Sequence, residues 1–209
     1  MRSSLRRFTP AACALVLLFA GVVRAVAGTA PTVAGTAPTE EPAIKVEATA
    51  GAALSKKDES AVKKTLTDYM AALQKRDYDK AGEMLDRASL LATVEPMVGT
   101  IAGDSTHAAS ARMKIFGVST RDSIEARSNG QLFGALMSYM TTVNPNAADI
   151  LARASIQVLA ARKMGDKVHV AYQVTLPPTE PGGMPYEQIT AQQMRKVDGK
   201  WRILFSLDQ

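Results

Sequence analysis

The stretch Val168–Leu176, VHVAYQVTL, carries a large apolar side chain at every second residue. A period of two is typical of a β-strand that buries one face and exposes the other. A shorter alternation, Ile156, Val158 and Ala160, precedes this stretch, and Gly165-Asp166 lies between the two at a position suited to a turn. Together they predict an antiparallel hairpin with one apolar face.

The alternation continues toward the C-terminus and predicts two more strands. Ile189 to Val197 forms the third, after a proline- and glycine-rich loop over residues 177–185. Asp198-Gly199 is a type I′ hairpin signal. The fourth strand has its apolar face at Trp201, Ile203, Phe205 and Leu207. The connections are too short for helical crossovers between parallel strands, so the sheet is expected to be an antiparallel meander of four strands.

Helical spacing dominates the first half of the folded region. Ser55 is suited to cap a helix whose apolar stripe consists of Val62, Leu66, Tyr69, Met70 and Leu73. Asp77 is placed to cap a second, shorter helix, with apolar positions at Tyr78, Ala81, Met84 and Leu85. Helices followed by an antiparallel meander predict an α+β fold in which the helices cover one face of the sheet.

The middle of the chain has a weaker pattern. Residues 88–118 show no clear period, and Pro96, Gly99 and Gly103 are expected to break any long element there. Ser119-Thr-Arg-Asp122 predicts the start of a short helix that Asn129-Gly130 ends. A third amphipathic helix follows, stopped by Asn144-Pro145; its apolar positions are Leu132, Phe133, Leu136, Met137 and Met140.

The N-terminal residues predict export. Residues 1–25 combine arginines, an apolar run from Ala11 to Val23 and small-residue cleavage sites after Ala25 and Ala27, the layout of a signal peptide. The run is too short to span a bilayer, so no membrane span is expected after cleavage. Residues 26–54 are expected to be a flexible linker rich in Ala, Thr, Pro and Gly, and residues 55–209 the folded domain. The expected location is the periplasm or the extracellular medium.

Composition excludes several classes of function. The net charge of +5 falls to +1 once residues 1–25, which hold four arginines and no acid, are removed, so nucleic acid is not an expected partner. Cys13 is the only cysteine, which excludes a disulfide framework. His107 and His169 have no metal-ligand spacing, no glycine-rich phosphate loop occurs, and Ser105 lies in no nucleophile elbow. No metal or cofactor is therefore expected.

Two segments resemble the nuclear transport factor 2-like superfamily: Tyr69–Tyr78, YMAALQKRDY, with Ala81 and Leu85, and Val197–Ile203, VDGKWRI. The resemblance extends over residues 58–207. It implies a cystatin-like cone fold, in which a curved four-stranded antiparallel sheet curls around a helix and encloses a cavity. Members of that superfamily use the cavity as an enzyme pocket or a ligand site, or fill it and use the outer face of the sheet for pairing.

The resulting hypothesis is an exported, non-catalytic binding or interaction module of the cell envelope. It would hold a small apolar ligand in the cone, or a partner on the sheet face, either a second copy or an envelope protein. The residues expected to line the ligand site are Tyr69, Phe116, Phe133, Met137, Tyr172 and Trp201.

The alternative is an enzyme similar to ketosteroid isomerases or polyketide cyclases. That resemblance implies Tyr69 as the donor to an enolate oxygen and Glu95, just before Pro96, as the general base. A base in an apolar pocket would have a raised pKa.

Overall fold

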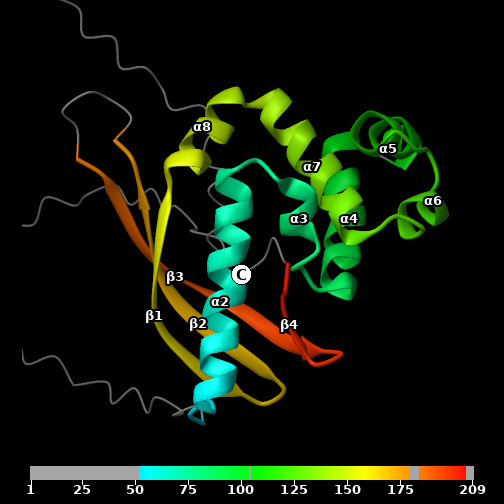
Figure 1. Cartoon of the computed structure of the whole chain (residues 1–209). Coiled ribbons are helices and arrows are strands. Elements are labelled where there is room, and N and C mark those ends of the chain that lie inside the picture. Colours follow the sequence, from blue (N-terminus) through cyan, green and yellow to red (C-terminus); the bar gives the residue numbers. More distant parts are fainter. Residues whose placement is uncertain (1–51, 104, 179–183, 206–209) are drawn as a thin grey trace, which may run out of the picture.

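The computed structural model describes residues 52–103, 105–178 and 184–205 (Figure 1). It has two layers, an open four-stranded antiparallel sheet in the order β1-β2-β3-β4 and a set of helices on one of its faces. The predicted α+β class and meander are therefore confirmed. The predicted signal peptide, and the linker up to residue 51, lie outside the described residues.

The four strands follow the predicted alternation closely. They are β1 (Ser155–Met164), β2 (Lys167–Leu176), β3 (Tyr186–Val197) and β4 (Lys200–Ile203). Asp198 and Gly199 both have positive φ, 49° and 75°, as a type I′ turn requires. On β2, Val168, Val170 and Tyr172 are buried against the helices, so the predicted apolar face is confirmed at these three residues.

Two details of the sheet differ from the prediction. The register of β1 shifts between Val158 and Ala160, and the inward position passes to Ala161, which is buried while Ala160 is exposed. An extra residue in one strand reverses the alternation beyond it. The fourth strand ends at Ile203 rather than continuing to Leu207, which lies outside the described residues, and Leu204 and Phe205 are both buried.

The first two helices agree with the sequence pattern. In α2 (Lys56–Gln74), the Ser55 hydroxyl accepts a hydrogen bond from the Asp58 backbone N–H at 3.1 Å, and the whole predicted stripe is buried. The short helix α3 (Tyr78–Gly82) is capped by Asp77, whose carboxylate accepts from the Lys80 N–H.

The middle region is more helical than predicted. Helix α4 (Arg87–Ala102) runs through Pro96 and Gly99, and only Gly103, with φ 77°, ends it. Its buried residues Leu90, Thr93, Val94, Met97 and Val98 hold the helix against the core, and this tertiary packing outweighs the weak local preference. Two further elements follow, η1 (Ser105–His107) and α5 (Ala108–Phe116).

The prediction for Asn129-Gly130 is wrong. Helix α6 (Arg121–Glu125), capped by Thr120, ends earlier, and Asn129-Gly130 open the next helix, α7 (Asn129–Val143). Ser128 and Gln131 form a capping box at its start. Asn144 ends α7 as predicted, but Pro145 then begins an additional helix, α8 (Pro145–Arg153), in the first-turn position that suits proline.

The helical layer is tied to both edges of the sheet. Helix α2 lies across the sheet (Figure 1), and the segment Met84–Asp86 runs beside β4, with bonds from the Ile203 N–H to the Met84 carbonyl and from the Asp86 N–H to the Ile203 carbonyl. At the β1 edge, the Lys163 N–H donates to the Ala52 carbonyl at 3.0 Å. Leu54 packs against the core, so contacts of the folded domain begin before Ser55. Within the described residues, no helix is both long and apolar enough to cross a membrane.

Candidate functional site

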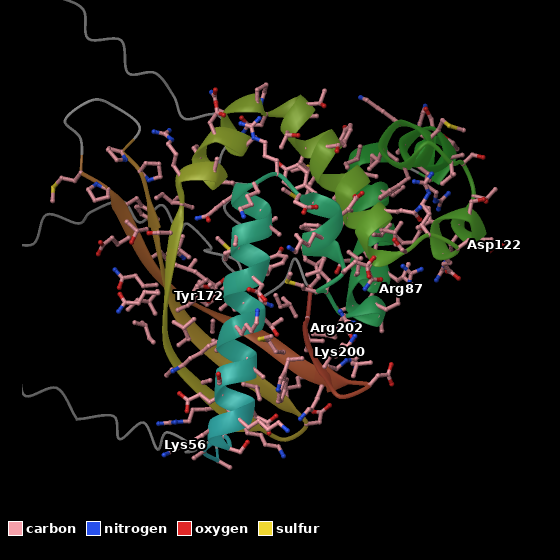
Figure 2. The ribbon with its side chains drawn as sticks, in the orientation of Figure 1. Lys56, Arg87, Asp122, Tyr172, Lys200 and Arg202 are labelled. Atoms are coloured by element: carbon pink, nitrogen blue, oxygen red, sulfur yellow. The ribbon has the colours of Figure 1, made fainter. Side chains whose placement is uncertain are left out.

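Five of the six residues expected to line a ligand site lie in the hydrophobic core. Their exposed fractions are 6% or less: Tyr69, Phe116, Phe133, Met137 and Tyr172. The rings of Tyr69 and Phe133 are 6.1 Å apart, and Tyr172 lies on β2 beside α2 (Figure 2). All five residues therefore belong to the one buried core of the described chain.

Phe205 also belongs to this core, although the sequence did not indicate it as a site residue. Phe205, which follows the end of β4, is buried and meets Phe133 edge-on, with ring centroids 5.7 Å apart and planes at 82°. The alternation of the fourth strand already predicted that Phe205 faces inward. It contained no signal that the chain leaves the sheet at this point.

Trp201 lies at the margin of the core rather than in the cluster. Its indole Nε1–H donates to the Asp58 carboxylate at 3.2 Å, and the Lys196 ammonium stands 5.6 Å from the ring centroid. Lys196 also donates to Asp58 at 2.8 Å. The hydrogen bonds from Lys196 and then Ser55 hold the pKa of the Asp58 carboxyl below its ordinary value. Trp201 therefore links β4 to the start of α2.

The two residues of the enzymatic alternative have very different surroundings. Tyr69 is buried, and burial raises the pKa of its hydroxyl. Glu95 is only partly buried, and its carboxylate accepts two hydrogen bonds from the Arg112 guanidinium, at 2.7 and 3.2 Å. This pairing lowers the pKa of Glu95, whereas a general base in an apolar pocket required a raised pKa. Glu95 therefore forms an ion pair with Arg112 of α5, whereas Tyr69 lies in the core.

The outer face of the sheet carries an apolar centre. Because Val170 and Tyr172 point toward the helices, Ala171 between them points away. Ala171 is opposite Ala160 on β1 and Ala191 on β3, and Ile189 lies two residues from Ala191 on the same face. We call the following residues the outer patch: Leu159, Ala160, Ala171, Ile189 and Ala191.

Exposure and surroundings set the outer patch apart from the interior. Ile189 is 67% exposed and Leu159 44%, and no described helix covers this face (Figure 1). On one side of the alanine row, Ile189 lies in a cross-strand row with Gln157 and Gln173, and on the other side the next row consists of Arg162, His169 and Gln193. The outer patch is thus an apolar centre with a polar rim.

The two histidines do not form a recognisable reactive centre in the described part of the chain. There, no group of three His, Cys, Asp or Glu side chains is placed to hold a metal ion. His169 is on the outer face of β2, and His107 is in η1 next to Thr106, whose hydroxyl lies 3.2 Å from the ring. The Ser105 side chain lies outside the described residues.

Comparison with known proteins leaves the chain without an assigned family. No protein-family model, no curated protein and no solved structure matches it.

Proposed function

We propose that this protein is an exported binding module, related to the nuclear transport factor 2-like superfamily, that docks a partner protein on the outer face of its sheet. The observation that carries this proposal is the outer patch. Four of its members are exposed and Ala171 is partly exposed, and they lie at the centre of a sheet face that no described helix covers.

The composition of that face supports docking. An antiparallel sheet that packs helices on one side usually presents polar residues to water on the other. Here the central row across three strands consists of Ala160, Ala171 and Ala191, with Ile189 beside them. Small side chains permit close approach of another surface, and exposed apolar patches rimmed by polar groups are typical of protein–protein contacts.

The packing of the core supports binding on the outer face of the sheet and not inside the expected cone. Five of the six side chains expected to line a ligand site are buried in the core, where Tyr69 and Phe205 both meet the ring of Phe133. The enzymatic alternative is not favoured either, because the carboxylate chosen as base is neutralised by Arg112. The signal-peptide pattern of residues 1–25 supports a partner in the envelope or the medium.

The proposal is tested by placing a charge at the centre of the outer patch. Ala171→Arg is expected to abolish complexes formed by the protein recovered from the envelope or medium of its own host, because an arginine buried without a partner is costly. Native mass spectrometry gives the mass of each complex, and so shows whether the partner is a second copy or another protein. It also shows whether cleavage follows Ala25 or Ala27.

The control is the same substitution on an exposed helical alanine, Ala109→Arg on α5, which is expected to leave complexes intact. Far-UV circular dichroism of both variants checks that the fold is retained. A wild-type protein found only as a monomer contradicts the proposal. Complexes that survive Ala171→Arg contradict it equally.

A further inference from the structure

Three segments that are distant in the sequence meet at one end of the molecule. The first turn of α2, the β1–β2 turn and the β3–β4 turn lie together at the lower end of the view in Figure 1. Hydrogen bonds join them there. Lys196 of β3 donates to the Asp58 carboxylate of α2 at 2.8 Å, and the Lys163 N–H of β1 donates to the Ala52 carbonyl just before α2. The three segments therefore present one continuous surface.

This end of the molecule holds most of the excess positive charge of the described residues. Residues 56–59, 162–167 and 195–202 include nine lysines and arginines but only four acidic residues. The remaining described residues hold eleven basic and ten acidic side chains, so they are close to neutral. Such an asymmetry produces a positive potential at one end, whatever the net charge of the chain.

The acidic residues at this end do not neutralise most of the cations. Asp58 pairs with Lys196, and Glu59 pairs with Lys63 in the next turn of α2. The six cations that form no ion pair with any described carboxylate we call the basic end: Lys56, Lys57, Arg162, Lys163, Lys167 and Lys200. All of them except Lys167, which is half-buried and donates to the Gln193 amide, are exposed.

The arrangement of the basic end suits a broad anionic surface. Its cations come from the start of a helix and from two hairpins, so a wide surface can contact all of them at once, whereas a single acidic group can contact only one or two. The β1–β2 hairpin also carries an apolar side chain, Met164, which is 47% exposed between Lys163 and Lys167. A lipid surface accepts both kinds of side chain, because cations bind the headgroups while an apolar side chain reaches the acyl boundary.

We propose that the basic end binds the surface of an anionic lipid bilayer. Each cation close to such a surface adds to the attraction, which extends over about 10 Å at 0.1 M salt. The outer patch lies in the middle of the strands, whereas the basic end lies where the strands turn. A domain bound to a bilayer by this end therefore keeps its outer patch accessible to a protein partner, and the two proposals rest on different residues.

The test is co-sedimentation of the protein with vesicles of phosphatidylcholine alone or mixed with phosphatidylglycerol. The protein is recovered from its own host, so every variant has the N-terminus that the cell gives it. The wild-type protein is expected to bind the anionic vesicles, to bind the neutral ones far less, and to be released by about 0.5 M salt. The triple variant Lys56→Gln, Lys163→Gln and Lys200→Gln removes one cation from each segment and is expected to bind at least about tenfold more weakly.

The matched control removes the same charge from exposed lysines elsewhere, by Lys75→Gln, Lys80→Gln and Lys114→Gln, and is expected to bind like the wild-type protein. Met164→Ser leaves the charge unchanged and is expected to weaken binding to anionic vesicles but not to soluble polyphosphate.

Three results would overturn the proposal. One is equal binding to neutral and anionic vesicles, and another is an equal loss in the two triple variants. The third is binding to polyphosphate together with an unchanged affinity of Met164→Ser for vesicles, which would assign the basic end to a soluble polyanion.

Discussion

The side chain next to Glu95 determines whether its carboxylate can act as a general base. The sequence places a glutamate before a proline, which suggests a base, but it does not reveal which side chain lies beside it. Arg112, seventeen residues later and on another helix, approaches to 2.7 Å and stabilises the charged form. A carboxylate held ionised in this way is a poor proton acceptor but contributes to the packing of α5 on α4.

The ion pair gives Glu95 a pH-dependent effect on stability. Since the pKa of Glu95 is lowered in the folded protein, its contribution is present above the ordinary pKa of 4.5 and is lost as the pH falls through the folded value. We expect Glu95→Gln to reduce the free energy of unfolding by up to about 1 kcal/mol at pH 7, and by much less at pH 3. Urea unfolding at both pH values measures this.

The control for Glu95→Gln is Glu59→Gln, which breaks the more exposed pair with Lys63 on α2 and is expected to have a smaller effect. If the loss in Glu95→Gln is the same at pH 3 as at pH 7, the ion pair is not its cause.

At the scale of elements, α3 packs on α7 through glycines. A Cβ added at Gly82 would lie 2.6 Å from the Asn129 carbonyl oxygen and 2.9 Å from the Gly130 Cα, both backbone atoms that cannot turn aside. The Gly130 N–H also donates to the Glu83 carboxylate at 2.9 Å, so the two helices are joined where they approach most closely. Gly130 therefore lies inside a helix because α3 packs closely against α7 at this point, and a side chain there would prevent that approach.

Two glycines are therefore expected to respond in opposite ways to alanine. Gly82→Ala should lower the free energy of unfolding by about 1–3 kcal/mol, the usual cost of overpacking. Gly99→Ala, inside α4 with no atom near the added Cβ, should raise it by up to about 1 kcal/mol through helix propensity. Thermal unfolding of both variants compares them. Stabilisation by Gly82→Ala would show that α3 and α7 are not in close contact.

The elements that sequence predicts well are those in which periodicity and packing agree. In α2 every predicted apolar position is buried, and on β2 Val168, Val170 and Tyr172 are buried. In α4 the local signals at Pro96 and Gly99 oppose a helix, and only the contacts of Leu90, Val94 and Met97 with distant elements reveal it. The shift in β1 depends on pairing with β2, which no local pattern contains. The outer patch follows from the same pairing, because only the register brings Ala160, Ala171 and Ala191 into one row.

For the whole molecule, contacts with the sheet and the core begin before Ser55, at Ala52 and Leu54. Ala52 bonds to Lys163 at the edge of β1, Leu54 packs on the core, and Ser55 caps α2. Together these contacts link the segment before α2 to β1, to the core and to α2 itself. Ala52 thus pairs with the free edge of β1 at Lys163, close to the Gly165 turn.

Three versions of the chain locate this boundary, beginning at Gly28, Ala52 and Lys56. The first two are expected to unfold with the same free energy in urea, because the contacts of Ala52 and Leu54 are present in both. The third loses the cap, worth about 1 kcal/mol, and the packing of Leu54, worth about 1 kcal/mol more, so it should be less stable by about 2 kcal/mol. If the chain beginning at Ala52 is already destabilised to that extent, residues before Ala52 contribute to the fold and the linker must be redefined.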